Sequence, residues 1–372
     1  MTVNAEPALL LPTGRLPALL AALRQAGYRC TGPAVENGAI VLRELETPDA
    51  LPRGLQAAQG PGQYRLTSDP ENRYFAWANG PQALKPLNFA PQETLWRVAR
   101  DAAGALAFEA VRPAPPKQAV IGVRACDLAA LALQDAHFLR VGRIDAQYAA
   151  RRAALFLVAV QCAVPAATCF CASTGDGPTP TSGYDIALAE LPDGFVATAG
   201  SEAGRAVLAP LNLAPATAQQ LDAARVQGEA AAAAQTRRLP SRNLHDALMR
   251  QLEHPRWDKV AARCLACGNC TAVCPTCFCH AELDQPALDG ASSTHERVWD
   301  SCFGESHGHL HGFNVRPDIR TRYRQWLTHK LAGWHEQFGR SGCTGCGRCI
   351  AWCPVGIDFT EEVAVLTAGD AA

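Results

Sequence analysis

The sequence predicts an α+β protein in three parts: a mixed α/β N-terminal domain, a helical connector and a cysteine-dense C-terminal domain. Three observations support this prediction. Strand-like and helix-like segments alternate through residues 1–200, residues 201–255 are Ala-rich and helical in pattern, and eleven of the 16 cysteines fall between Cys264 and Cys353. Because each shift in composition marks a boundary, we expect domains over 1–200 and 256–372, joined by a connector over 201–255.

The N-terminal elements follow from hydrophobic patterns. Residues 16–28 have helical spacing and end at Gly27, a plausible helix stop. The apolar run 119–123 predicts a buried strand, residues 125–139 a helix, and 156–162 a second strand. Residues 184–191 and 194–199 form a probable strand pair. Strands that alternate with helices favour an α/β or α+β domain.

Composition excludes several classes of function. Hydrophobic residues make up 48% and charged residues 19%, which is typical of a globular protein. The net charge of −1 gives no reason to expect nucleic acid or an anionic membrane as a partner. The N-terminus has no basic region before its apolar residues, and no run of 18 apolar residues predicts a membrane span. We therefore expect a cytoplasmic protein, in which reduced cysteines serve metal or redox chemistry.

Two cysteine runs share one spacing. Each reads Cys-x2-Cys-x2-Cys-x3-Cys-Pro, over Cys264–Pro275 and Cys343–Pro354. Three thiolates separated by two residues let one tight loop hold three corners of an iron–sulfur cube. Gly268, Gly345 and Gly347 allow the backbone to approach that cube closely. The C-terminal part is thus predicted to be a two-cluster, ferredoxin-like domain.

The fourth cysteine of such a run ligates the other cluster in two-cluster proteins. We therefore expect two [4Fe–4S] clusters with exchanged fourth ligands: Cys264, Cys267, Cys270 and Cys353 for cluster 1, and Cys343, Cys346, Cys349 and Cys274 for cluster 2. Zinc is the rival metal. A zinc site needs four ligands and gives no reason for a third cysteine, the x3 spacing and the proline in both runs.

The tetrapeptide TCFC occurs twice, at Thr168–Cys171 and Thr276–Cys279. The first copy belongs to an N-terminal set of four thiols, Cys126, Cys162, Cys169 and Cys171. Cys126 follows the strand 119–123 and Cys162 ends the strand 156–162, so neighbouring strands would place both thiols at one sheet edge. One hypothesis is a third [4Fe–4S] cluster at this set. The other is that these are small buried residues or free thiols in turns.

The second copy leaves three thiols, Cys277, Cys279 and Cys302, outside the two runs. An additional cluster there needs a ligand from elsewhere. Otherwise these thiols pack around the existing clusters and tune them. Cys30 has no partner by spacing, and we expect it to be structural.

Three alternating histidines lie in the stretch SHGHLHG, at His307, His309 and His311. They could bind a metal, but we favour a solvated loop.

The sequence contains no GxGxxG that opens a helix after a strand and no GxxxxGK[ST] loop. We therefore expect flavin or nicotinamide chemistry on a partner chain.

Together these motifs resemble the β subunits of cytoplasmic sulfhydrogenases, which are NAD(P)-linked soluble [NiFe] hydrogenases. They are also similar to the A subunit of anaerobic sulfite reductases. The residues that carry the resemblance lie between about 120 and 358 and include GVRACDLAAL (122–131), CAVPAATCFCASTGDGP (162–178), CLACGNCTAVCPTCFC (264–279), VWDSC (298–302), RYRQWLTHK (322–330) and GCTGCGRCIAWCPVGID (342–358). Residues 1–115 add little to it.

The resemblance implies an iron–sulfur electron carrier. It would lie between a flavin- and NAD(P)-binding subunit and the hydrogenase small and large subunits, or a sulfite reductase subunit, with the α/β domain as the docking platform for the flavoprotein. Such a subunit makes and breaks no substrate bonds. The alternative is a catalytic subunit that reduces sulfur, polysulfide or sulfite at an iron–sulfur site. Activity of the isolated chain with a chemical reductant separates the two.

Overall fold

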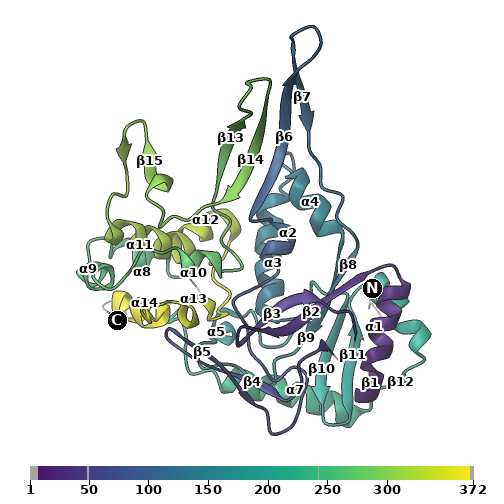
Figure 1. Cartoon of the computed structure of the whole chain (residues 1–372). Helices are drawn as coiled ribbons and strands as arrows, with labels where there is room; N and C mark the ends of the chain where they lie inside the picture. Colours follow the sequence, from purple (N-terminus) through teal and green to yellow (C-terminus); the bar gives the residue numbers. More distant parts are fainter. Residues whose placement is uncertain (1–6, 48–49, 242, 369–372) are drawn as a thin grey trace.

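In this computed structural model, which describes residues 7–47, 50–241 and 243–368, a mixed sheet of eight strands forms the centre of the N-terminal half (Figure 1). The four central strands β2, β8, β9 and β10 run parallel to one another, and antiparallel strands complete both edges. In spatial order the strands are β12 (Ala214–Pro215), β1 (Leu9–Pro12), β11 (Gly194–Ala199), β10 (Ile186–Leu191), β9 (Leu155–Val160), β8 (Gln118–Val123), β2 (Arg29–Glu36) and β3 (Ala39–Glu44).

Helices cover both faces of this sheet because the central strands are apolar on both sides. On one face, α1 (Leu16–Gln25) and α6 (Glu202–Leu208) pack with alternate residues such as Ile121 and Val158. On the other, α3 (Ala125–Phe138) packs on Val120 and Leu157, and α7 (Ala218–Ala233) contacts β10 and β11. Three further helices lie nearby: α2 (Lys85–Asn88), α4 (Ala146–Ala153) and α5 (Cys171–Thr174).

A second, antiparallel sheet joins the two halves of the chain. Its order is β13 (His280–Pro286), β14 (Ser292–Trp299), β6 (Gln92–Arg100) and β7 (Leu106–Ala110), and it projects from the body in Figure 1. Arg297 of β14 and Glu93 of β6 form a buried ion pair, with Nε to Oε1 at 3.0 Å. The hairpin of β4 (Leu55–Gly60) and β5 (Gln63–Ser68) lies against the C-terminal part, where Gly62 N donates to Ile350 O at 3.0 Å.

Short helices build the C-terminal part around a separate core. That core includes Trp257, Trp326, Leu331 and Val363, and cysteine side chains pack against it. The elements are α8 (His245–Met249), α9 (Arg256–Ala261), α10 (Asn269–Ala272), β15 (His309–Leu310), β16 (Phe313–Asn314), α11 (Ile319–Thr328), a π-helical turn (His329–Gly333), α12 (Trp334–Phe338), α13 (Arg348–Ala351) and α14 (Phe359–Thr367).

The mixed α/β architecture predicted from the sequence is confirmed. The helix expected over 16–28 spans Leu16–Gln25, and the expected strands at 119–123 and 156–162 are β8 and β9. The segments 184–191 and 194–199 pair antiparallel as β10 and β11. None of the helices in the described ranges combines the length and apolar content that crossing a membrane requires.

Candidate metal centres

The two cysteine runs fold into equivalent loops. Gly268 and Gly347 have φ of 72° and 74° and lie directly before α10 and α13. Because a side chain disfavours this left-handed region, glycine lets each loop turn sharply into its helix. The third cysteine of each run, Cys270 or Cys349, is then carried in a short helix. The two helices pack against each other.

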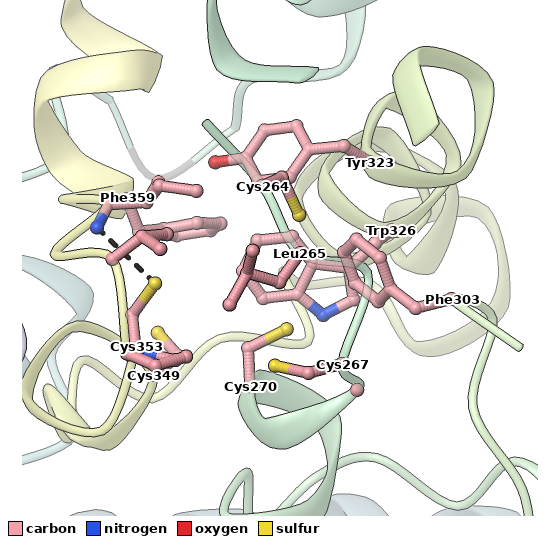
Figure 2. Close-up of a pocket in the computed structure, with 14 residues that line it drawn as sticks. Cys264, Leu265, Cys267, Cys270, Phe303, Tyr323, Trp326, Cys349, Cys353 and Phe359 are labelled. Atoms are coloured by element: carbon pink, nitrogen blue, oxygen red, sulfur yellow. Dashed lines mark hydrogen bonds between the residues drawn. The ribbon is translucent and has the colours of Figure 1, made fainter. Parts of the chain in front are cut away.

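The first chamber is an apolar space that five sulfurs face (Figure 2). Its sulfurs belong to Cys264, Cys267 and Cys270 of the first run and Cys349 and Cys353 of the second. Aromatic rings of Phe303, Tyr323, Trp326 and Phe359 form much of its wall. Backbone N–H groups already donate to two of the sulfurs: Ala266 N to Cys264 Sγ at 3.4 Å and Ile357 N to Cys353 Sγ at 3.3 Å.

The second chamber lies beside the first. It is lined by Cys343, Cys346 and Cys349 of the second run and by Cys274 of the first. Cys349 lines both chambers, and so do the rings of Trp326 and Phe359. The first TCFC copy closes this chamber through Phe170, whose N–H donates to Gly345 O at 2.8 Å.

Both chambers suit an anionic iron–sulfur cube. Each is apolar and is lined by at least four thiols, the number that one [4Fe–4S] cluster requires. Among the described residues, the buried polar atoms Tyr323 Oη, Trp326 Nε1 and Thr344 Oγ1 on these walls lack a hydrogen-bond partner. A buried donor without a partner is costly, and cluster sulfides are acceptors that such donors can reach.

Lys330 places a buried positive charge beside the second chamber. Its Nζ donates to Thr276 Oγ1 at 2.9 Å. Burial lowers the pKa of Lys330, but the nearby side chains of Cys274 and Cys277 outweigh this and hold its pKa well above the usual value. Burial in turn raises the pKa of the Cys343 thiol to about 12. Burial therefore disfavours a free thiolate at Cys343, and the Lys330 cation can compensate the charge of a bound anion in this chamber.

The N-terminal thiols gather at one edge of the large sheet. β8 and β9 are parallel neighbours, so Cys126 at the start of α3 and Cys162 just after β9 lie at the same edge. Cys171 interacts electrostatically with Cys126, Cys162 and Cys169. Side-chain N–H groups point at three of the sulfurs: Asn79 Nδ2 to Cys126 at 3.3 Å, Arg124 to Cys162 at 3.8 Å and Gln235 Nε2 to Cys171 at 3.3 Å.

This N-terminal set adjoins the second chamber. Cys346 interacts electrostatically with Cys126, Cys169 and Cys171. Between them lies the buried guanidinium of Arg348, which pairs with Asp127 at 2.6 Å and donates to Gly80 O at 3.0 Å. No local pattern indicates a role for Arg348, Asn79 or Gln235, because each contacts its partner only through long-range packing.

The remaining cysteines divide into a group and a single residue. Cys277, Cys279 and Cys302 lie near one another and near His307, as their mutual electrostatic interactions indicate. Cys30 lies alone in the core of the large sheet. His309 and His311 are exposed, whereas His307 is half-buried. Over the described ranges, no three side chains of His, Cys, Asp or Glu converge tightly enough for a single metal ion.

Comparisons with known proteins agree with this geometry. Residues 263–357 match the family model of the 4Fe-4S dicluster domain. The chain is 32% identical over 248 residues to the sulfhydrogenase 2 subunit beta of Pyrococcus furiosus, which covers 66% of this chain and 72% of that protein. This chain belongs to the sulfhydrogenase β-subunit family. No solved structure matches this chain. The C-terminal part is accordingly a [4Fe–4S]-type domain.

Proposed function

We propose that this chain is an electron-relay subunit. It passes single electrons between a flavin- and NAD(P)-binding subunit and hydrogenase small and large subunits, with a sulfite reductase subunit as the alternative terminal partner. The observation that carries this proposal is the continuity of the thiol sets. The two chambers share Cys349, and the N-terminal set adjoins Cys346. Bound iron–sulfur clusters accept and release one electron at potentials between roughly −700 and +450 mV.

The proposed ligands follow the exchange of fourth cysteines between runs. Cys264, Cys267, Cys270 and Cys353 hold cluster 1, and Cys343, Cys346, Cys349 and Cys274 hold cluster 2. The lining of each chamber by both runs supports this assignment. A third cluster is held by Cys126, Cys162, Cys169 and Cys171. Its support is the set of N–H donors aimed at these sulfurs, since hydrogen bonds to sulfur are one way in which proteins tune cluster potentials.

The rest of the chain then excludes water and balances charge. Aromatic walls keep the first chamber apolar, and the buried cations Lys330 and Arg348 offset the negative charge of the bound groups. The large sheet is the docking platform for the flavoprotein. A reducing compartment such as the cytoplasm fits a chain with this many free thiols.

Paired cysteine variants test the ligand assignment. In anaerobically prepared protein, Cys353→Ser should remove the same electron paramagnetic resonance signal as Cys264→Ser, and Cys274→Ser the same signal as Cys346→Ser. Cys30→Ala is the matched control and should leave both signals intact. If Cys353→Ser instead removes the same signal as Cys346→Ser, the fourth ligands are not exchanged between the two runs.

Reconstitution tests the function itself. The purified chain, reduced chemically, should pass electrons to a flavoprotein or hydrogenase partner and should reduce no polysulfide or sulfite alone. Turnover of polysulfide or sulfite by the isolated chain would establish the catalytic alternative.

Cys126→Ala with Cys171→Ala should lower the iron content by about four per chain, the content of one [4Fe–4S] cluster.

A further inference from the structure

Four cysteines remain after the proposed clusters are assigned. Cys30 lies in the core of the large sheet, and the other three meet at the base of one hairpin. Cys277 and Cys279 immediately precede β13, and Cys302 follows β14. In the β13–β14 ladder, His280 pairs with Trp299, and Asp300 N extends the ladder by donating to Cys279 O at 2.9 Å. The register therefore brings the Cys279 and Cys302 side chains near each other, and the two thiols influence each other's pKa.

A histidine from the next turn completes the group. The ring of His307 lies near the Cys279 thiol, which raises the pKa of the imidazole, and its Nδ1 contacts Asp300 Oδ2 at 2.5 Å. A carboxylate that fixes one ring nitrogen is the usual second-sphere partner of a metal-bound histidine, because it sets the tautomer and the orientation of the other nitrogen. His309 and His311, in the same stretch, are exposed.

The surroundings suit an anionic group larger than one ion. A hollow of about 340 Å³ adjoins Cys277 and Cys279 and is also lined by Lys85, Trp299 and Asp300. Lys85 is buried, with Nζ 3.0 Å from Thr271 O and 3.9 Å from the centre of the Trp299 ring. Lys330 hydrogen bonds to Cys277 from within the core. A structural zinc site closes four ligands around one ion and calls for neither this space nor two buried cations.

We propose that Cys277, Cys279, Cys302 and His307 hold a further iron–sulfur cluster through three thiolates and one imidazole. Each TCFC copy then supplies two ligands, Cys169 and Cys171 in one case and Cys277 and Cys279 in the other. The site lies beside both ferredoxin-type sets, because Cys277 hydrogen bonds to Cys274 and Cys302 interacts with Cys270. A neutral imidazole in place of a thiolate raises cluster potential, so this site accepts electrons more readily than its all-cysteine neighbours.

Isotope labelling tests the nitrogen ligand without any substitution. In the reduced, anaerobically prepared full-length chain, pulsed electron paramagnetic resonance should detect coupling to a histidine nitrogen that changes when 14N-histidine is replaced by 15N-histidine. His307→Ala should abolish this coupling, and His309→Ala with His311→Ala should leave it unchanged. His307→Cys should keep the iron content while losing the coupling and lowering the potential of that cluster.

Metal analysis tests the thiols. Cys279→Ala with Cys302→Ala should lower iron and acid-labile sulfide by about four per chain and leave the signals lost in Cys264→Ser and Cys346→Ser intact. The proposal is overturned if wild-type protein shows no histidine coupling, if this double variant keeps its full iron content, or if the variant loses zinc instead. Because the ferredoxin-type signals are followed separately, failure here is distinguishable from failure of the proposed relay.

Discussion

At the scale of single residues, the two cysteine loops differ where they meet the rest of the chain. Ala266 and Gly345 precede the second cysteine of their runs, and both have positive φ, 50° and 65°. A Cβ on Gly345 would lie 2.5 Å from the backbone of Cys171, because the first TCFC copy packs directly on this loop. The second loop therefore needs glycine for space as well as for conformation.

Gly345→Ala should consequently destabilise the protein. Backbone overpacking and a strained left-handed alanine together cost about 2 kcal/mol or more. The matched variant Ala266→Gly relieves a strained φ and should change the free energy of unfolding by less than about 1 kcal/mol. Thermal unfolding of both variants under anaerobic conditions provides the comparison. Equal unfolding temperatures for the two variants would mean that the segment Thr168–Cys171 moves away from residue 345 without loss of stability.

Lys330 is well placed to set the reduction potential of the proposed cluster 2. Reduction adds an electron to the second chamber, and a buried cation beside Cys274 and Cys343 favours that reduced state. Lys330→Met should therefore lower the potential of cluster 2 by about 60 mV, which corresponds to about 1.4 kcal/mol for one electron. Lys259→Met, on the exposed side of α9, should leave it unchanged. A redox titration that finds no difference between these variants would contradict this role.

At the scale of elements, α13 and α3 are tied together at their first turns. Arg348 and Asp127 form an ion pair in which both side chains are almost fully buried. Arg348 also donates to carbonyl oxygens of Gly80 and Gln82, on the segment before α2. This contact holds the dicluster domain on the edge of the large sheet where the N-terminal thiols gather.

Asp127→Asn should leave Arg348 charged, buried and without its counter-ion. Loss of one member of a buried pair costs about 3–5 kcal/mol, so the unfolding midpoint should fall markedly. Glu253→Gln removes an exposed carboxylate that pairs with Arg320 and Arg324 and should cost at most about 1 kcal/mol. Denaturant unfolding measures both. A small effect of Asp127→Asn on the free energy of unfolding would show that water or Cys346 compensates the charge of the Arg348 guanidinium.

Sequence patterns predicted local elements well and distant pairings poorly. β8, β9 and the β10–β11 pair are continuous apolar runs, and the Cys-x2-Cys-x2-Cys-x3-Cys-Pro spacing is itself local, so both were visible in the sequence. The pairing of β6 with β14 was not visible in the sequence, because the paired residues Glu93 and Arg297 are 204 residues apart. The proximity of His307 to Cys279 is hidden from the sequence for the same reason, because it exists only once β13 and β14 have paired.

At the scale of the whole molecule, the two main cores differ in what they contain. The core of the large sheet is built from aliphatic and aromatic side chains, with Cys30 as its one cysteine among the described residues. The C-terminal core includes Cys343, and eight further cysteines of the described residues pack against it or line its chambers, including Cys264, Cys270 and Cys353. Its helices are short, most of them one or two turns, so they gain little stability from their own hydrogen bonds.

Removal of iron should therefore unfold one half of the molecule and spare the other. Metal binding contributes free energy to folding wherever ligands form the core. After anaerobic chelation, hydrogen exchange should accelerate in α9–α14, while β8–β11 keep their protection. Wild-type protein held anaerobically without chelator is the control, and Cys264→Ser with Cys346→Ser should resemble the chelated sample. Loss of protection throughout the chain would mean that the large sheet depends on the clusters too, through the thiols at its edge and the Arg348–Asp127 contact.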